Sequence, residues 1–510
     1  MKHNALNLRI SCNNVELAKI SRFFFKITRM FFCAIILAMS SCMNPFSCGP
    51  TGDQGIFACG ASLMTNGGVI YKDYFDHKGP IFYIIEAAGY RLDGITGIWI
   101  AEIITCTLAF LMISKIIDFY AYNNITKMAA FVMSFACFAG WFCRGNMTEE
   151  FAVFPIATSL YIFIKYFRNE SSVGTEHVVI IGMMFGIILG IRPNMIGVWL
   201  GCIPIVIYKL CKEKKYIKLV SYIFRFILGV VIIVVPVLLW LMKYDALKNM
   251  IDDYIIFNFL YSDQGVSNLL VTYGAFFKNM CLFGLPLWIV IWFYSKFVRT
   301  KINYENMSIL LSLICSVILA NYSGYFFTHY YMVIIPLYSI LFAVGFESLL
   351  QKSHQIHNLS RYKVVICILT IIFSLWAGKM FCFFTITNNS TSYNRNIENI
   401  KELSKFVNSF IDEKDSIYST LGPLFYLYSE HYPTVRFSYF PYIDEKKGEF
   451  QKEEFVQQFN AKRPEWIFVE DGWEKQNYDR MDLNCVKESI FLYYKKITSY
   501  QGMTLWRCVE

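Results

Sequence analysis

The sequence predicts an α-helical polytopic membrane protein, and three observations support this prediction. Of the 510 residues, 56% are apolar and only 17% are charged, and the mean hydropathy is +0.41. A soluble domain usually has about 25% charged residues, so this chain is too apolar for a surface that faces water. The aromatic content is also high, with 47 Phe, 34 Tyr and 10 Trp. This composition excludes a disordered chain, a collagen and a small disulfide-linked scaffold.

About eleven apolar segments (11–13) are expected to be transmembrane helices. A bilayer core needs about 20 apolar residues per helix, and fewer where several helices shield one another. The first segment follows a basic leader (1–19) and lacks the small-residue cleavage site of a signal peptide. The segments lie near 20–41, 95–118, 126–143, 151–167, 178–191, 195–209, 219–242, 279–298, 306–321, 330–347 and 363–385.

The basic residues are sorted between two sets of loops, and this sorting predicts the orientation of the chain. With the N-terminus inside, the inside segments carry 21 basic and 7 acidic residues. The outside loops carry 8 basic and 11 acidic residues. Because basic loops stay in the cytoplasm, we expect a cytoplasmic N-terminus and an extracytoplasmic C-terminus in the cell inner membrane.

The C-terminal segment, 388–510, is predicted to be a small extracytoplasmic α/β domain. Its composition is polar, with 16 basic and 19 acidic residues after position 385. The patterning predicts a helix near 395–411 and strands near 416–420, 466–470 and 504–509. Cys485 and Cys508 could pair in an oxidising compartment. The sequence contains no P-loop or Gly-rich dinucleotide motif, and nothing in it predicts a nucleic-acid partner.

The first outside loop, 42–94, contains the most informative motifs. They are Thr51-Gly-Asp53-Gln-Gly, Tyr71-Lys-Asp73 and Asp76-His77-Lys78-Gly-Pro80. Asp53 begins a stretch that is expected to be helical to residue 64, and Pro80 begins a short apolar helix that is expected to lie along the interface. Charged groups at the membrane boundary are functional candidates, because placing them there is costly.

Simpler interpretations of these residues remain open. Asp53 could be a helix N-cap. Asp76 and Lys78 could form a local ion pair on the surface.

The motifs of this loop resemble the first periplasmic loop of the polytopic C-type-fold glycosyltransferases. These include the protein O-mannosyltransferases and the aminoarabinose transferases of lipid A, and the bacterial mannosyltransferase-like subgroup is the most similar. The resemblance covers residues 20–350 in order, and the C-terminal segment resembles the family only in position. Its further motifs are Thr148-Glu149-Glu150, Arg192-Pro193-Asn194, Asn258-Phe-x-Tyr261 and His329-Tyr330-Tyr331.

The resemblance implies an enzyme that transfers a sugar from a polyprenyl-phosphate carrier to an acceptor hydroxyl on the outer face of the membrane. The acceptor, whether a cell-envelope glycan, a lipid or a protein, stays open. Asp53 would be the general base. Lys78 would contact the lipid phosphate, with Arg144 and Arg192 as further cationic donors. Within the same donor site, Asp76, His329 and Tyr330 are the remaining candidates for binding the substrate or its lipid phosphate.

The family's second acidic position falls on Glu149 or Glu150. Adjacent residues project about 100° apart on a helix, so only one of them can face the site, and Glu149 fits the family pattern better. No cofactor is required by the sequence. A divalent metal is possible, because some relatives hold one with an acid directly before the loop lysine. This chain has His77 there, so His77 and Glu150 are the candidate ligands.

Two rival functions remain open. A polysaccharide polymerase or ligase would place its large loop between spans, whereas this chain has its soluble mass at the C-terminus. A transporter of lipid-linked glycans would need ionisable groups near the bilayer midplane and broken helices in paired halves. Only Glu102, Arg225 and Lys379 are expected within spans. We therefore expect residues 20–387 to be a transmembrane glycosyltransferase domain.

Overall fold

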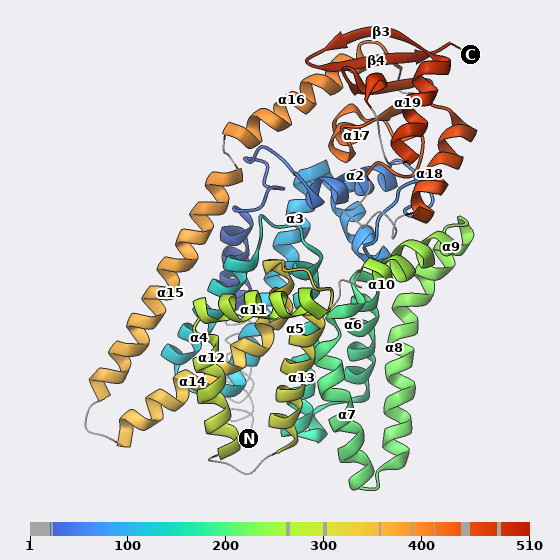
Figure 1. Cartoon of the computed structure of the whole chain (residues 1–510). Helices are drawn as coiled ribbons and strands as arrows, with labels where there is room; N and C mark the ends of the chain where they lie inside the picture. The colour runs from blue at the N-terminus through green and yellow to red at the C-terminus, as the bar shows by residue number, and fades with distance from the viewer. Residues whose placement is uncertain are drawn as a thin grey trace, which may run out of the picture.

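The chain folds into a helical body with a small domain built on a β-sheet at one end (Figure 1). The computed structural model describes residues 21, 24–261, 266–298, 303–355, 359–388, 391–412, 414–439, 449–476 and 481–509. The basic leader expected at 1–19 lies outside these residues.

The helical body begins with a helix over residues 24–38. The next seven helices are α2 (Asp53–Thr65), α3 (Pro80–Tyr120), α4 (Asn124–Trp141), α5 (Thr148–Arg168), α6 (Thr175–Ile191), α7 (Gly197–Lys212) and α8 (Tyr216–Lys243). After α8 come α9 (Leu247–Met250), a π-helical turn (Ile251–Ile256), α10 (Phe257–Tyr261), α11 (Val266–Leu282) and α12 (Leu285–Phe293). The body closes with α13 (Tyr304–Asn321), the 3-10 segment η5 (Thr328–Ile334), α14 (Ile335–Gln355) and α15 (Leu359–Asn388).

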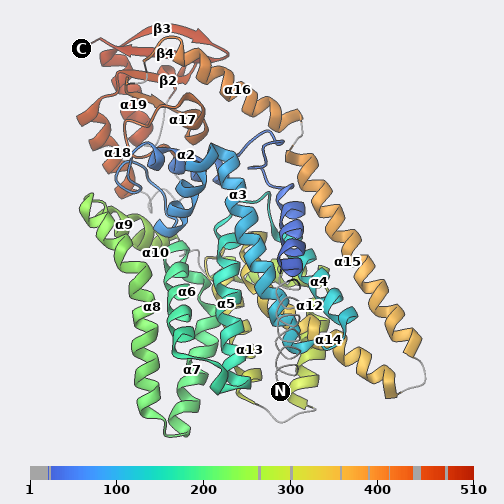
Figure 2. The same cartoon turned by 180° about the vertical axis from the view of Figure 1, so that it is seen from behind.

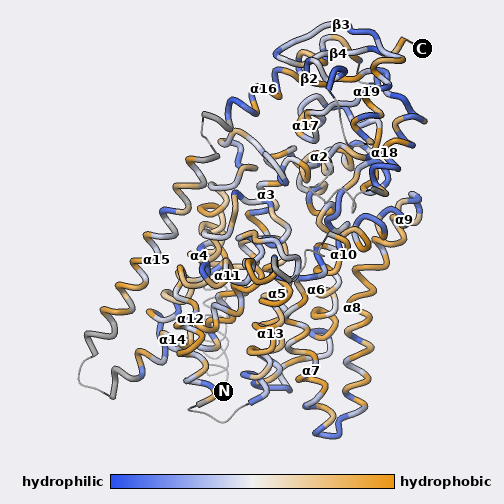
Figure 3. The backbone as a smooth tube through the Cα atoms, viewed as in Figure 1, coloured by the Kyte–Doolittle hydropathy of each residue, from blue (hydrophilic) through white to orange (hydrophobic). Residues whose placement is uncertain are grey.

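Five of the described helices are long and apolar enough to cross a membrane, namely α3, α5, α8, α13 and the segment Thr328–Gln351. Each overlaps a predicted span. Two shorter apolar helices, Thr175–Ile191 and Cys367–Met380, fall on predicted spans as well. Helix α8 buries only Gly229 and Leu241 inside the protein and is hydrophobic along most of its length (Figure 3). Such a helix suits contact with lipid. The total of eleven spans stays a prediction.

The predicted span 279–298 is wrong as a single straight helix. The chain bends by 82° between Asn268–Leu282 and Leu285–Phe297. Gly284, at the bend, has a left-handed φ of 63°, a conformation that glycine adopts at little cost. Helix α11, which precedes the bend, lies across the body (Figure 1) and was not expected from the sequence.

Helix α3 joins the short helix expected at 81–90 to the span expected at 95–118. The two parts meet at a kink where Asp93 and Gly94 leave the helical conformation. Gly94 has a φ of 54°, and a glycine tolerates this value without a steric penalty. The first part of α3 packs against α2, which fixes the first loop on top of the body.

The loops that were predicted to lie inside contact one another at one end of the helical body. Lys26 pairs with Asp118 at 2.9 Å. Arg168 pairs with Glu305 at 2.9 Å. The sheet domain lies at the opposite end, away from the turn between α7 and α8 (Figure 1). The two sets of loops sorted by charge are thus separated in space.

The C-terminal residues form a four-stranded sheet with order β1-β2-β4-β3. Strands β1 and β2 are parallel, and the other two pairs are antiparallel. The elements after α16 (Thr391–Asn408) are β1 (Ile417–Ser419), α17 (Pro423–Ser429), α18 (Glu449–Lys462), β2 (Trp466–Glu470), α19 (Met481–Tyr493), β3 (Tyr494–Tyr500) and β4 (Met503–Cys508). The helix and three strands expected from the sequence correspond to α16, β1, β2 and β4. The disulfide between Cys485 and Cys508 is not formed, and the Cys485 thiol donates to Asn460 at 3.5 Å instead.

The sheet domain docks on the first loop of the helical body. Helix α17 packs on α2, and the two lie together when the molecule is seen from behind (Figure 2). Buried Arg436 forms ion pairs with Asp253 of the body and with Glu454 of its own domain. This arrangement places the domain directly over the loop with the candidate site residues.

Candidate functional site

The start of helix α2 places Asp53 at the rim of the candidate site. Asp53 is the first residue of the helix and is exposed to solvent. The N-cap is Gly52, so the alternative of Asp53 as an N-cap is wrong. Asp53 lies close enough to Lys78, His329 and Tyr330 to act on them electrostatically.

Lys78 lies in a tight loop that ends at the start of α3. The Tyr71 hydroxyl donates to the Lys78 carbonyl at 2.6 Å and holds the loop closed. The Lys78 Nζ is 2.7 Å from His77 Nε2 and lies 5.8 Å from the centre of the Phe57 ring. Burial lowers the pKa of Lys78, and the carboxylates of Asp76 and Asp53 oppose this shift. The ammonium group of partly buried Lys78 thus lies within electrostatic range of the exposed Asp53 carboxylate.

His77 supports Lys78 as a neutral ring. Burial, followed by the charges of Lys78 and Arg192, holds the pKa of His77 well below its usual value. A neutral imidazole has one acceptor nitrogen, so Nε2 can accept a hydrogen bond from the Lys78 ammonium. The other ring nitrogen, Nδ1, lies 3.3 Å from Asp76 Oδ1. On the backbone side, Asn258 of α10 donates to the His77 carbonyl at 2.7 Å.

Asp76 holds the loop in place through contacts with two tyrosines. Its side chain is fully buried. One oxygen accepts from Tyr83 at 2.5 Å, and the other accepts from Tyr439 of the sheet domain at 2.6 Å. A buried carboxylate with both oxygens occupied would repel a phosphate. Asp76 therefore anchors the loop to its surroundings, and its role in binding the substrate or its phosphate stays a prediction.

Glu149, at the start of α5, belongs to the same cluster as Lys78. Its Oε1 accepts from Arg192 at 2.5 Å, and its Oε2 lies 3.9 Å from His329 Nε2. Arg192 also donates to the Tyr330 hydroxyl at 2.8 Å and stacks on that ring at 4.2 Å. Lys78 lies in the electrostatic range of both Glu149 and Arg192. The structure thus brings together Asp53, Lys78, Glu149, Arg192, His329 and Tyr330.

Glu150 points into a separate buried cluster. It accepts from the Asn146 backbone at 2.9 Å and from the Cys106 thiol at 3.4 Å. Of the two adjacent acids, Glu149 is the one in the cluster with Lys78. Because Glu150 and His77 lie in different clusters, the prediction that they share a metal is not supported. Within the described ranges, no three His, Cys, Asp or Glu side chains are placed to hold a metal ion.

Arg144 lies beside the start of α2 and contacts Thr51 Oγ1 at 2.7 Å. It belongs to a run of four residues, from Cys143 to Asn146, that all have positive φ. Gln54 donates to two carbonyls of this run, those of Cys143 and Gly145. Arg144 therefore lies next to the Asp53 rim and outside the contacts of Lys78 that the structure shows.

Several residues that contact the candidate site were not identified from the sequence. Tyr439 and Arg436 reach the site from the sheet domain, and no local pattern marks a contact across more than 360 residues. Asn258 was noted as part of a motif, but its contact with His77 required the fold.

Comparison with known proteins adds a family and a fold. A sequence profile of the family described as putative competence-induced protein Ccs4, N-terminal domain, matches residues 13–387. The chain is similar to the solved structure of ArnT from Cupriavidus metallidurans bound to undecaprenyl phosphate. The TM-score is 0.61 at 12% identity, over 93% of this chain and 96% of that chain.

A second structure of ArnT from Cupriavidus metallidurans, in the apo state, gives a TM-score of 0.60 at 11% identity, over 96% of this chain and 98% of that chain. Archaeal oligosaccharyltransferase AglB from Archaeoglobus fulgidus, in complex with an inhibitory peptide and a dolichol-phosphate, gives 0.48 at 11% identity, over 96% and 75% of the two chains. No curated protein sequence matches the chain. The likeness to ArnT confirms the C-type glycosyltransferase fold that the motifs indicated.

Proposed function

The chain belongs to the family described as putative competence-induced protein Ccs4, N-terminal domain, and from this premise we propose that it is a membrane glycosyltransferase. In this proposal it moves a sugar from a polyprenyl-phosphate carrier to an acceptor hydroxyl at the outer face of the cytoplasmic membrane. The observation that supports the proposal is the cluster in which partly buried Lys78 lies within electrostatic range of the exposed Asp53 carboxylate, of Glu149 and of Arg192.

The leaving group of such a transfer is a lipid phosphate, which requires fixed positive charge. Within the described part of the chain, Lys78 makes no ion pair with a carboxylate, and its Nζ contacts neutral His77. A cation without a paired carboxylate in a partly desolvated site attracts an anion strongly. Lys78 therefore contacts the lipid phosphate in this proposal. Arg192, already paired with Glu149, adds positive charge from the other side.

The acceptor hydroxyl must lose its proton as it attacks the anomeric carbon. Asp53 takes this proton, a new bond forms between the acceptor oxygen and the anomeric carbon, and the bond from that carbon to the phosphate oxygen breaks. The carrier phosphate leaves with the bond electrons toward Lys78. Asp53 suits this role because its carboxylate is exposed and accessible to an acceptor from outside.

Glu149 acts on the arrangement of the site in this proposal. Its carboxylate accepts from Arg192 and lies next to His329, so it orients both side chains. The proposal leaves the acceptor and the sugar open. It assigns residues 20–387 to the transferase domain and 388–510 to an extracytoplasmic domain that covers the first loop. A polymerase or ligase with a large loop between spans is not favoured, since the sheet domain follows the last helix of the body.

The test is transfer in vitro from a panel of radiolabelled undecaprenyl-phosphate sugars into envelope fractions, with the full chain purified in detergent. We expect transfer from at least one donor. The Asp53→Asn variant should lose at least about 100-fold in rate, a typical contribution of a general base. Glu176→Gln is the matched control, because Glu176 is also an exposed acid in the first turn of an apolar helix. Full activity of Asp53→Asn at normal expression would rule out the proposed base.

A further inference from the structure

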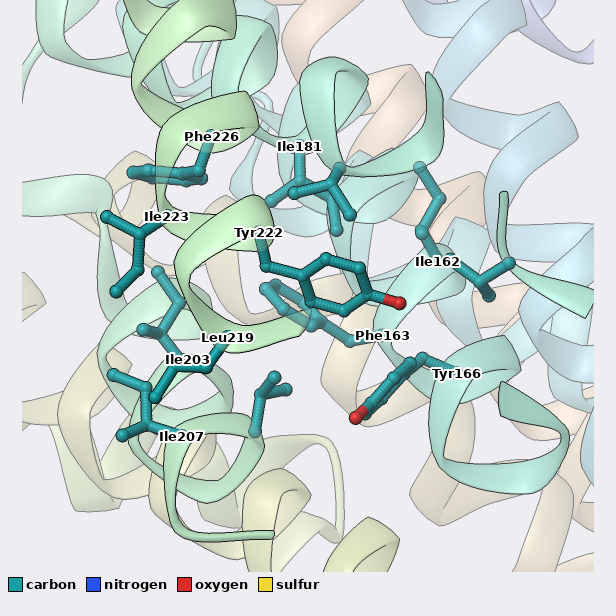
Figure 4. A pocket seen from close by; sticks show the side chains of 13 residues that line it. Ile162, Phe163, Tyr166, Ile181, Ile203, Ile207, Leu219, Tyr222, Ile223 and Phe226 are labelled. Carbon is teal, nitrogen blue, oxygen red and sulfur yellow. The ribbon is translucent and has the colours of Figure 1, made fainter. Parts of the chain in front are cut away.

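A cavity of about 140 Å³ lies among helices α5, α6, α7 and α8, at the end of the body opposite to the candidate site. Its walls are apolar side chains from all four helices (Figure 4). Ile162 comes from α5, Ile181 from α6, Ile203 from α7, and Ile223 and Phe226 from α8. Helix α8 is largely exposed along its outer face. The cavity therefore lies in the part of the body that is best suited to face lipid.

The cavity wall includes a polar atom, the Tyr166 hydroxyl, that has no partner among the described residues. Tyr166 lines the cavity (Figure 4) and is 3% exposed. Its hydroxyl is buried and makes no hydrogen bond to any described residue. Burying a hydroxyl without a partner is costly, so it favours a ligand that has a polar group beside its apolar chain, such as the ester region of a lipid. The ammonium of Lys209 lies 4.6 Å from the centre of the same ring.

A second hollow of about 680 Å³ adjoins the apolar cavity, because Val173 and Tyr222 line both. This second hollow is lined by Lys214, Lys215 and Lys218. It also includes the first residues of α6 and α8. Backbone N–H groups at a helix start favour an anion. The apolar cavity and the basic hollow thus share a wall formed by Val173 and Tyr222.

The basic charge at this second hollow exceeds the acidic charge around it. Residues 209–218 contain five lysines and one glutamate. Glu170 alone accepts from three of these lysines, Lys209, Lys215 and Lys218. One carboxylate is shared by three ammonium groups, and Glu213 is the one other acid paired with them in the part of the chain that the structure describes. This leaves positive charge that an anion can neutralise.

We propose that this region binds an anionic phospholipid of the membrane. One hydrocarbon chain enters the apolar cavity, and the phosphate lies at the lysines of the second hollow. Tyr222 lines both hollows, so in this proposal the boundary between chain and headgroup lies at its side chain. This site is separate from the Lys78 cluster and does not depend on the proposed transfer reaction.

The test is native mass spectrometry of the full chain in detergent with phosphatidylglycerol, and with phosphatidylcholine as the neutral lipid. We expect phosphatidylglycerol to be retained in preference. The double variant Lys214→Gln with Lys218→Gln should bind it roughly tenfold more weakly, since each lysine near an anionic headgroup contributes to affinity. Val206→Phe, which fills the cavity from α7, should weaken binding by a similar factor.

Controls decide between this site and general surface attraction. Lys462→Gln with Lys475→Gln removes two exposed lysines of the sheet domain and should leave binding unchanged. Thermal unfolding checks that each variant is folded, and Ile223→Phe replaces Val206→Phe if that variant is not. Equal retention of both lipids would overturn the proposal, as would full binding by a folded cavity-filling variant. Displacement by inorganic phosphate would show that the lysines bind a free anion, which also contradicts it.

Discussion

Both ends of the helical body contain clusters of charged side chains, but the two clusters differ in how far they are buried. At the end far from the sheet, Glu170 is surrounded by lysines with side chains up to 44% exposed. Burial opposes ionisation of Glu170, and hydrogen bonds from Lys209, Lys218 and Lys215 outweigh it, so its pKa falls to about 2. At the sheet end, burial lowers the pKa of Lys78, whose nearest polar partner is a neutral imidazole.

This difference indicates distinct uses of charge. Exposed ion pairs contribute little to stability and are screened by salt. Partly buried charges are screened less by water and salt, so they attract a phosphate more strongly. Changes at the sheet end should therefore affect stability and activity strongly, and matched changes at the other end should affect both weakly.

The largest effect on stability is expected from Arg192→Met. It leaves Glu149, 2% exposed, as a buried carboxylate without its guanidinium partner. Removing one member of a buried pair costs about 3 kcal/mol or more. Arg168→Met is the matched control, because it breaks the pair with Glu305 at the other end, where the arginine is 31% exposed. Thermal unfolding in detergent measures both, and an equal or larger loss in Arg168→Met would contradict the comparison.

A smaller effect is expected from Tyr439→Phe, which removes the bond from the sheet domain to Asp76. A hydrogen bond to a charged group contributes about 1.5–3 kcal/mol, and the loop that carries His77 and Lys78 should loosen. We expect a lower unfolding temperature and slower transfer. Tyr428→Phe is the control, because its buried hydroxyl has no hydrogen-bond partner within the described ranges. If both variants behave alike, the Tyr439 hydroxyl does not hold the loop.

The smallest effect is expected at Glu170. Its pKa in the folded protein, about 2, lies below the ordinary value of 4.5. A lowered pKa stabilises the folded state above the unfolded pKa, and this contribution is lost as the pH falls from about 4.5 toward 2. Glu170→Gln should remove this part of the acid sensitivity and cost at most about 1 kcal/mol at neutral pH, because two of its three lysine partners, Lys215 and Lys218, are exposed. Unfolding of the wild type and of Glu170→Gln, followed between pH 3 and pH 7, measures this contribution. The stability difference between the two should shrink toward acid pH, and a difference that grows would contradict the prediction.

Local features of the fold were predicted from the sequence with good accuracy. Helix α2 begins at Asp53 and strand β2 spans Trp466–Glu470, as expected. Apolar periodicity and helix-start signals lie within a few residues of one another, so they are readable in sequence. The bend at Gly284 and the exposed edge strand β3 were missed, because a glycine in an apolar run and a lysine-containing strand give weak local signals.

The candidate site was predicted only in part, because local motifs are readable in the sequence but the contacts between distant residues are not. Asp53 and Lys78 come from two motifs of the first loop and Arg192 comes from a later one, and the fold brings them within electrostatic range of one another. The choice between Glu149 and Glu150 required the direction of each side chain on α5. The anchoring contact of Asp76 could not be predicted, because its partner Tyr439 lies 363 residues away in the chain.

The central claim is that Lys78 holds the donor phosphate, and binding of undecaprenyl phosphate to the purified full chain tests it most directly. Lys78→Gln removes the partly buried charge, and Lys72→Gln removes an exposed lysine of the same loop. We predict that Lys78→Gln weakens donor-lipid binding by at least about tenfold, or ~1.4 kcal/mol, with little change in the KM for the acceptor. Lys72→Gln should bind as the wild type does. Equal losses for the two variants, or equal effects of Lys78→Gln on donor and acceptor, would contradict the proposed site.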